Sequence, residues 1–442
     1  MSTPDTHTDT DTDVEARHAG LTFRTLDASA HDGPDRDLVR GFGEAVVRGF
    51  HDGRMTDEHV AVWLEGARGD GQRFTGAWPE RTAIASPHVP VATFSSWSGG
   101  DLNVGAGHSL PLHMISDVTV SPTHRRRGLM RKLMDDDLHA AAARGHALAG
   151  LTATEGSIYG RFGFGPATRL HSVEVDVSER FRLRPSSDDG SLELVDPADA
   201  WAAMVAVQRR HQSITRGGLT WPAFYEAFAT GRFSWDNGGP DRKLQVVLHL
   251  DADGEPDGFA SWTHKGEQDG VRTVDAGDVV AHTPGGYLAL WQFLAGIDLT
   301  RRVRWGRAPL VDALPWALVD PRCVTTTNVR DMLWLRVLDV VTALEARPWY
   351  ADGTVVLGIE DAVGLIDGSW QVTVTDGRAA VTRSDEAPEV SLTADTLGAL
   401  YLGGVDVATL HAAGRITGDP AAVGRWATLA DGGPTPYCTT GF

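Results

Sequence analysis

The spacing of apolar and polar residues divides the chain into three blocks of predicted helices and strands. In the first block, apolar residues either repeat at three- and four-residue intervals or form short continuous runs. These patterns predict helices over residues 37–50 and 58–67, strands over 91–94 and 115–120, a helix over 128–144 and a strand over 147–153. The last three of these elements follow one another as strand, helix and strand.

The second block begins near residue 173 and has a similar order of elements. Its pattern predicts helices over 197–212 and 221–230, strands over 244–250, 258–263 and 272–280, and a last helix over 285–297. This last helix follows a strand directly, as the helix over 128–144 does in the first block. We therefore interpret the second block as a diverged repeat of the first.

The third block begins near residue 331 and has a different character. Its pattern predicts strands over 333–337, 354–359, 370–375 and 378–382, and then short amphipathic helices over 395–402 and 420–430. Residues 431–442 are rich in Gly, Pro and Thr and show neither pattern, so this segment is either frayed or docked. At the other end, residues 1–20 alternate Thr with Asp and have almost nothing to bury, which predicts a disordered tail.

Length and charge narrow the possible functions. The chain has 442 residues, about three times a typical domain of roughly 150 residues. Its formal net charge of -19 repels nucleic acids and anionic membrane surfaces, so neither is an expected partner, whereas a cationic small molecule is plausible. With two cysteines and no signal-peptide or membrane-span pattern, the protein is predicted to be cytoplasmic. The histidines, among them His108 and His113, show no zinc spacing, and no metal is predicted.

The strand over 115–120 leads into an arginine-rich turn and then directly into a helix. Unpaired backbone N–H groups and the positive end of the helix dipole favour an anion such as a pyrophosphate at such a position. Arg125–Arg127 can add charge-assisted hydrogen bonds, and Gly128 lets an anion approach the backbone. An exposed basic turn would have the same sequence, and these residues alone leave both interpretations open. The corresponding residues 281–286 of the second block lack the arginines, so that turn is predicted to bind no phosphate.

A second segment with candidate chemistry contains Tyr159 in an aromatic, glycine-rich turn after the strand over 147–153. A tyrosine hydroxyl, with an ordinary pKa of about 10, can donate a proton to a departing thiolate, whose conjugate thiol has a pKa of about 8.5. Packing of Tyr159 against Phe162 and Phe164 is the alternative interpretation, and spacing alone favours it.

Several motifs together resemble the enhanced intracellular survival (Eis) family of GNAT acetyltransferases. Arg125 and Gly128 match the GNAT signature R/Q-x-x-G-x-G/A, although Met130 departs from its last position. The segment S-I-Y-G-R-F-G-F-G-P-A-T, the segment L-G-A-L-Y-L-G-G at 397–404 and a chain ending in Phe442 complete the resemblance. It covers nearly the whole chain after the N-terminal tail. These bacterial enzymes modify amines, including aminoglycoside antibiotics.

The resemblance implies a fold and an assembly. The chain would be α/β (α+β), with an active GNAT domain, a second GNAT domain that is degenerate, and a C-terminal domain similar to sterol carrier proteins. After the tail at 1–20, we expect these domains to cover residues 21–172, 173–330 and 331–442. A homohexamer is also implied.

The resemblance further implies acetyl-CoA as the cosubstrate and assigns roles to residues. The donor would be bound by Val118, Thr119, Val120, Arg125, Arg126, Arg127, Gly128, Leu129 and Met130, with backbone groups of Val118 and Val120 facing the pantetheine arm. Tyr159 would be the general acid and the terminal carboxylate of Phe442 the base. Glu155 is the alternative base.

Three residues are candidates for binding the amine: Asp52, Trp63 and Asp117. Trp63 could instead simply pack the domain, and Asp117 could be an ordinary strand residue. Two positions depart from the family pattern, because Gly441 replaces an acidic residue and Thr152 replaces a histidine. These departures leave the specificity for aminoglycosides open.

The sequence therefore favours an acetyl-CoA-dependent N-acetyltransferase that transfers acetyl directly to a polycationic, aminoglycoside-like amine. The alternative function is a ligand- or lipid-binding protein that uses its C-terminal domain and keeps an inactive acetyltransferase scaffold.

Overall fold

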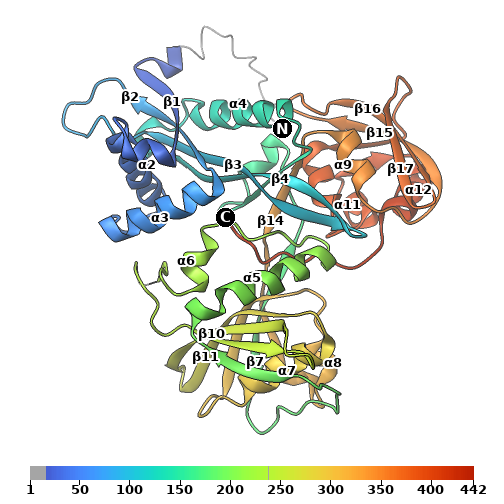
Figure 1. Ribbon diagram of the computed structural model, residues 1–442. Coiled ribbons are helices and arrows are strands. Elements are labelled where there is room, and N and C mark those ends of the chain that lie inside the picture. Colours follow the sequence, from blue (N-terminus) through green and yellow to red (C-terminus); the bar gives the residue numbers. More distant parts are fainter. Residues whose placement is uncertain (1–15, 237) are drawn as a thin grey trace.

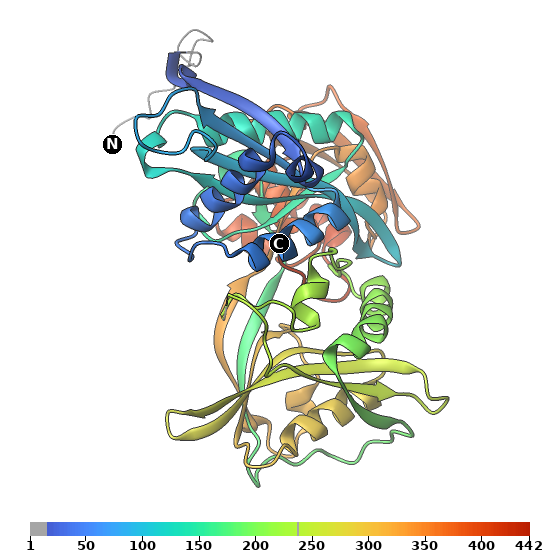
Figure 2. The ribbon, with the colours of Figure 1, turned by 60° about the vertical axis from the view of Figure 1, so that its left-hand side comes forward.

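Three β-sheets with their helices make up the described part of this computed structural model, which comprises residues 16–236 and 238–442. In Figure 1 the first sheet lies at the upper left, the second below it and the third at the upper right. The chain end, marked C, lies near the centre, between the upper and lower parts of the molecule. Figure 2, turned by 60°, shows the same central position.

The first sheet has seven strands in the order β1-β2-β3-β4-β5-β14-β6. Its strands are β1 (Leu21–Asp27), β2 (Arg73–Pro79), β3 (Ala92–Gly105), β4 (His108–Val120), β5 (Leu148–Thr152), β6 (Gly165–Pro166) and β14 (Leu333–Val337). Three α-helices pack with it: α2 (Arg36–Gly49), α3 (Asp57–Asp70) and α4 (Leu129–Ala143). Short 3-10 helices are η1 (Ala28–Asp32), η2 (Pro122–His124) and η3 (Tyr159–Phe162). Helix α4, as predicted, buries apolar residues spaced by three and four, including Leu133 and Leu138, in the core beside β4 and β5.

The second sheet also has seven strands, in the order β13-β7-β12-β11-β10-β9-β8. Its strands are β7 (Arg169–Asp176), β8 (Ser191–Val195), β9 (Gln245–Leu250), β10 (Pro256–Gln268), β11 (Val271–Ala281), β12 (Arg302–Ala308) and β13 (Val324–Asp331). Its helices are α5 (Pro197–Ile214), α6 (Tyr225–Ala229), α7 (Pro284–Ala295), α8 (Leu314–Ala317) and the 3-10 helix η4 (Pro321–Cys323). The parallel pair β11 and β12, joined through α7, corresponds to the parallel pair β4 and β5, joined through α4. This correspondence supports the predicted repeat.

The third sheet has five strands in the order β17-β16-β15-β18-β19. They are β15 (Gly353–Glu360), β16 (Gly368–Thr375), β17 (Arg378–Arg383), β18 (Val390–Thr393) and β19 (Ile416–Gly418). The helices are α9 (Val340–Ala346), α10 (Ala394–Leu400), α11 (Val407–Ala412) and α12 (Pro420–Ala430). Trp426 of α12 and Tyr401 are completely buried in the core of this domain.

Three expectations from the sequence need correction. The strand at 333–337 exists, but as β14 it pairs with β5 and β6 in the first sheet, so residue 331 is no clean boundary of the third domain. Residues 1–15 of the expected tail lie outside the described residues, whereas 16–20 form a helical turn and its exit. The helix expected at 221–230 is shortened to α6, because Pro222 and neighbouring residues form turns instead.

Glycines of the segment 397–404 allow the C-terminal domain to dock closely on the first. A Cβ atom at Gly398 would lie 2.1 Å from the carbonyl oxygen of Leu335 in β14, and one at Gly404 would lie 2.3 Å from that of Ala167. No larger residue fits at either position without moving the backbone. The motif that marked the family in the sequence therefore has a structural role in joining two domains.

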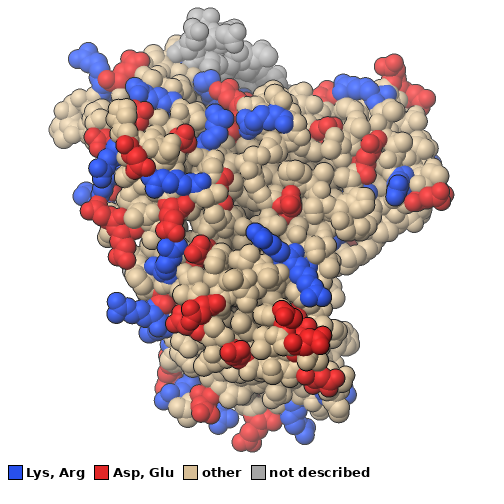
Figure 3. All heavy atoms as spheres, viewed as in Figure 1, with Lys and Arg blue, Asp and Glu red and all other residues tan. Residues whose placement is uncertain are grey.

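Figure 3 shows acidic and basic side chains intermixed over the visible face of the described molecule. Among the described residues, no helix is long and apolar enough to cross a membrane.

Candidate active site

A cavity of about 680 Å³ lies beside the arginine-rich turn and contains every residue predicted to bind acetyl-CoA. It forms because β4 and β5 diverge. The two strands pair in parallel only from Leu112 to Met114 on β4 and from Leu148 to Gly150 on β5. Beyond this point the backbone of Val118–Val120 has no partner on β5, as the resemblance to GNAT enzymes implied. We call this space the donor cavity.

The backbone of the turn is shaped to receive an anion. Arg126 and Gly128 both have positive φ, at 64° and 76°, in the turn that precedes α4. No side chain caps the N-terminus of α4, so its first N–H groups are available at the cavity. A concave turn with free N–H groups at the positive end of a helix dipole favours phosphate oxygens.

The arginines of the turn differ in what they contact. The Arg127 side chain donates from Nε to the carbonyl oxygen of Arg17, at 2.6 Å, and from Nη2 to that of Ala19, at 3.0 Å. Arg127 thus holds the segment before β1 against the turn, and Arg17 also lines the donor cavity. This contact was not predicted, because residues 16–20 were expected to belong to a disordered tail.

Tyr159 reaches the donor cavity from η3. Its side chain is 7% exposed, and its ring meets Phe164 edge to face with centroids 6.4 Å apart, so it packs as well as lining the cavity. Burial and the nearby charge of Glu155 raise the pKa of the Tyr159 hydroxyl. The group is therefore protonated at neutral pH, as a proton donor must be.

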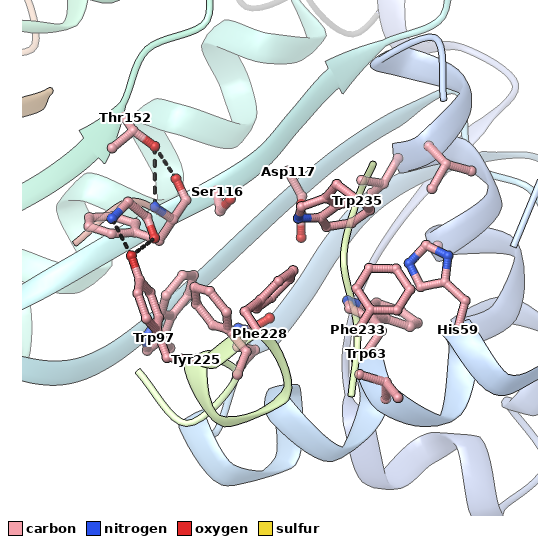
Figure 4. A pocket seen from close by; sticks show the side chains of 18 of the residues that line it. His59, Trp63, Trp97, Ser116, Asp117, Thr152, Tyr225, Phe228, Phe233 and Trp235 are labelled. Atoms are coloured by element: carbon pink, nitrogen blue, oxygen red, sulfur yellow. Dashed lines mark hydrogen bonds between the residues drawn. The ribbon is translucent and has the colours of Figure 1, made fainter. Parts of the chain in front are cut away.

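A second cavity, of about 540 Å³, brings together Trp63, Asp117 and Phe442. We call it the acceptor cavity, and Figure 4 shows part of its lining. Asp52, also predicted to bind the amine, is exposed in the loop after α2 and is not among the lining residues. Its charge partly opposes the lowering of the pKa of the lining residue His59 by burial.

The last residues of the chain are docked in this cavity. The Thr152 hydroxyl donates to an oxygen of the Phe442 terminal carboxylate and accepts the Phe442 N–H at 3.3 Å. Gly441 donates its N–H to the Tyr225 hydroxyl at 2.7 Å. The Phe442 ring meets Trp97 edge to face, with centroids 5.7 Å apart. The sequence left open whether the segment 431–442 is frayed or docked, and docking is confirmed for its last residues, Gly441 and Phe442.

Asp117 is held firmly where β4 is bulged against β3. Its φ of 53° is positive, and the register of the two strands shifts here. The Thr93 hydroxyl donates to its backbone carbonyl at 2.7 Å, and the Ser95 hydroxyl donates to its carboxylate at 2.6 Å. Burial raises the pKa of this carboxyl group.

The two cavities adjoin the same ends of β4 and β5. Asp117 lines the acceptor cavity and the next residue, Val118, lines the donor cavity. At the end of β5, Thr152 and Thr154 are divided between the cavities in the same way. Glu155 lies on the donor side, so it does not share a cavity with Phe442.

One wall of the acceptor cavity was not found from the sequence. It consists of His59 from α3 and of Phe228, Phe233 and Trp235 from α6 and the following loop of the second domain. The rings are in contact, with centroids 4.5 Å apart for His59 and Phe233 and 5.2 Å apart for Phe233 and Trp235. No local pattern marks these residues, because only the packing of two domains brings them together. We call them the aromatic wall.

The corresponding turn of the second domain differs in its capping and in its charges. Thr283 caps α7 by accepting the N–H of Gly286 at 3.1 Å, and its hydroxyl donates to Asp257 at 3.2 Å. Asp188 lies beside the same helix end, since a Cβ at Gly285 would be 3.2 Å from its carboxylate. These carboxylates would repel a phosphate. In the described part of the chain, no group of three or more His, Cys, Asp or Glu residues could hold a metal ion.

This arrangement defines a tandem GNAT acetyltransferase with a third domain, whose last residues line the acceptor cavity. Residues 96–167 and 227–337 match two family models that are both described as acetyltransferase (GNAT) domains, and residues 340–439 match a sterol carrier protein domain.

Comparison with related sequences identifies the family within the GNAT acetyltransferases. N-acetyltransferase Eis of Mycobacterium tuberculosis is 35% identical over 75% of this chain and 81% of its own length. An uncharacterized N-acetyltransferase of Streptomyces avermitilis is 37% identical over 74% of this chain and 79% of its own. The chain therefore belongs to the Eis family of N-acetyltransferases, as the sequence motifs predicted.

Solved structures agree with this assignment. The crystal structure of Eis1 from Mycobacterium abscessus is similar with a TM-score of 0.78 and 26% identity, over 96% of this chain and 100% of that one. A probable N-acyltransferase from Enterococcus faecalis, at 17% identity, has a TM-score of 0.79 over 96% of this chain and 100% of its own, and it supports the fold alone. The predicted fold class of two GNAT domains and a sterol-carrier-like domain is confirmed.

Proposed function

We propose that the chain transfers the acetyl group of acetyl-CoA directly to a primary amine. The observation that carries the proposal is that consecutive residues of β4, Asp117 and Val118, line the acceptor cavity and the donor cavity. An amine in the acceptor cavity and a thioester in the donor cavity can approach each other there, which removes much of the entropic cost of the reaction. The uncapped end of α4 with Arg125 and Arg126 would bind the pyrophosphate, and the backbone of Val118–Val120 would bind the pantetheine arm.

Tyr159 and the Phe442 carboxylate are the proposed acid and base. The amine nitrogen would form a bond to the acetyl carbon while the carbon–sulfur bond breaks. The proton lost from the nitrogen would pass to the Phe442 carboxylate, directly or through water, and Tyr159 would donate a proton to the thiolate. The ordinary pKa of a terminal carboxyl group is only about 3.3 to 3.7, so its main contribution would be to orient the ammonium group. Docking between Thr152 and Tyr225 supports this role, because it fixes the chain end in the acceptor cavity.

The finer features implied by the family remain proposals. A polycationic acceptor of the aminoglycoside type is what the family resemblance implies; Asp117 in the cavity is suited to one ammonium group, whereas Arg307 and Arg330 in the same lining oppose several. The homohexamer and the cytoplasmic location also stay predictions, and sedimentation analysis tests the former. The second GNAT domain is proposed to bind no CoA, since Thr283 caps α7 and the carboxylates of Asp257 and Asp188 lie beside this helix end. The alternative function, lipid binding on an inactive scaffold, is less well supported, because Trp426 and Tyr401 fill the C-terminal core.

The proposed function is tested by incubating the protein with acetyl-CoA and a panel of amines. The panel contains an aminoglycoside, a polyamine, a lysine-containing peptide and simple monoamines. Mass spectrometry then detects a gain of one acetyl group on the amine, and release of free thiol gives the rate. The proposal expects acetylation of at least one amine that depends on Tyr159. Thiol release without acetylated amine would indicate hydrolysis and would contradict it.

A further inference from the structure

The acceptor cavity continues into a second space inside the second domain. This inner cavity, of about 310 Å³, contains Gly277 and Asp278 of β11 and Gly306 of β12. It lies where β11 and β12 diverge after pairing through Ala276 and Trp305. Four residues line both spaces and form their junction: Tyr225, Phe228, Arg307 and Arg330.

The junction contains two arginines, and one of them, the exposed Arg330, lacks a carboxylate partner among the described residues. Arg307 forms an ion pair with Asp278 at 3.0 Å. Arg330, in contrast, donates only to the carbonyl oxygen of Gly306, at 3.3 Å, and to the sulfur of Met332, at 3.8 Å, and forms no ion pair with any carboxylate of the described residues. Burial and the neighbouring charge of Arg307 lower the pKa of Arg330. Asp278 pairs with Arg307 alone, so the Arg330 guanidinium can receive a carboxylate of a ligand, while the Phe442 carboxylate and Asp117 of the same cavity can receive its amine.

This junction is close to the proposed reaction centre. Met332, which contacts the Arg330 guanidinium, also lies against the chain end, since a Cβ at Gly441 would be 2.9 Å from its terminal methyl carbon. Tyr225 of the junction accepts the Gly441 N–H. A ligand with its anionic group at Arg330 could therefore place another part of itself beside Phe442.

The rest of the lining is largely apolar and aromatic. Asp117 is the single side-chain carboxylate among the described lining residues of the acceptor cavity. Burial lowers the pKa of His59 in the aromatic wall, although Asp52 and Glu44 oppose this effect, so the ring is neutral at neutral pH. Such a wall favours an apolar body, since burying apolar surface contributes roughly 25 cal/mol per Å². A ligand with several ammonium groups would bring positive charges against Arg307 and Arg330.

We propose that the preferred acceptor is an amphipathic primary amine with an aromatic or alkyl body and a carboxylate, and that Arg307 and Arg330 bind this carboxylate. The amine would lie near Asp117 and Phe442, and the body would lie along the aromatic wall. This inference rests on the proposed acetyltransferase function and specifies its substrate class.

The test compares amines that differ only in the carboxylate. We choose 4-(aminomethyl)benzoate with benzylamine and 8-aminooctanoate with octylamine, and add kanamycin and spermine as polycations. The carboxylate member of at least one pair should have a kcat/KM about tenfold to a hundredfold higher, the range expected of a charge-assisted hydrogen bond. Arg330→Gln should abolish this advantage mainly by raising KM, while the kinetics of octylamine and benzylamine change little.

A control and a second measurement keep the test decisive. Arg378→Gln changes an exposed arginine of β17 that lines neither cavity and should leave both pairs unchanged. Octanoate and 4-methylbenzoate, which lack the amine, should inhibit competitively against the amine, and Arg330→Gln should weaken this inhibition by a similar factor. Equal kcat/KM within both pairs, or a higher kcat/KM for kanamycin or spermine, would overturn the inference while acetyl transfer stands. Failure of every amine would overturn the proposed function and the inference with it.

Discussion

The Thr152 hydroxyl and the backbone of Phe442 form hydrogen bonds to each other although the two residues are 290 positions apart in the sequence. Thr152 is the last residue of β5, at the edge of the space where β4 and β5 diverge. A residue contributed by the C-terminal domain is therefore fixed beside the strands of the first domain that line the two cavities. The third domain thus supplies part of the proposed active site.

Extension of the chain beyond Phe442 should remove most acetyltransferase activity. A short C-terminal tag would convert the terminal carboxylate into a peptide bond and would place extra residues in the acceptor cavity. We expect the tagged protein to keep its circular dichroism spectrum and thermal midpoint, and to lose at least about tenfold in kcat with any amine accepted by the untagged protein. Deletion of Phe442 should behave similarly. The same tag at the N-terminus is the control, and full activity of the C-terminally tagged form would falsify the role of the carboxylate.

Tyr159→Phe should lower turnover with little effect on folding. The change removes one hydroxyl, keeps the ring packed against Phe164 and does not touch the arginine-rich turn. Loss of a general acid lowers kcat by roughly 10² to 10⁴, and the KM for acetyl-CoA should stay within about twofold. Steady-state kinetics with acetyl-CoA as the varied substrate gives both values. A loss of less than about threefold would assign Tyr159 to packing alone.

Most features formed by residues close together in the sequence were predicted, whereas features formed by distant residues were not. The turn at Arg125–Gly128 and the helix after it were found because their residues are contiguous and the backbone geometry follows from them. The pattern also found β14, but it could not show that this strand joins the first sheet, because strand pairing is decided by tertiary packing. Strands β1 and β2 were missed; Gly76 and Pro79 weaken the apolar pattern of β2.

Sites that form only where separate domains pack together could not be predicted from the sequence. Trp235 and Arg330 carry no local signal for a cavity, since α3 and β4 of the first domain come to face them only in the folded chain. The correct placement of Phe442 came from the family resemblance, because a chain end by itself predicts fraying.

Arg125→Glu should weaken binding of acetyl-CoA strongly. The substitution replaces a donor of charge-assisted hydrogen bonds by a carboxylate that repels the phosphates. We expect the KM for acetyl-CoA to rise at least about tenfold, with the thermal midpoint unchanged because Arg125 is exposed. Thr283→Ala in the second domain is the matched comparison, since it removes the cap of α7 and should cost about 1 kcal/mol of stability without changing this KM. If the two variants changed the KM equally, the assignment of the donor cavity to the first domain would be wrong.

Asp361→Asn should destabilise the junction between the first and third domains. Arg336 of β14 and Asp361 form an ion pair at 2.5 Å, with side chains 0% and 1% exposed. The same carboxylate accepts the N–H groups of Leu365 and Ile366. Loss of one partner leaves a buried guanidinium without its counter-charge, so the free energy of unfolding at pH 7 should fall by about 3 to 5 kcal/mol in urea titrations followed by circular dichroism. Asp32→Asn, which breaks the exposed pair of Asp32 with Arg68, should cost no more than about 1 kcal/mol.

The pH dependence of this effect follows from the pKa of Asp361. Burial raises that pKa, but the hydrogen bond and charge of Arg336 and the backbone donors outweigh burial, so the pKa in the folded protein lies below its ordinary value. A carboxyl group with a lowered pKa contributes stability that is fully present above its unfolded pKa of about 3.9 and is lost as the pH falls through the folded value. The difference in stability between the wild-type protein and Asp361→Asn should therefore be constant from neutral pH down to about pH 5 and shrink below about pH 4. A difference that stayed unchanged at lower pH would show that Asp361 does not act as a carboxylate in this pair. In that case the double variant Arg336→Met/Asp361→Leu, which removes both charged side chains, should be no more stable than Asp361→Asn.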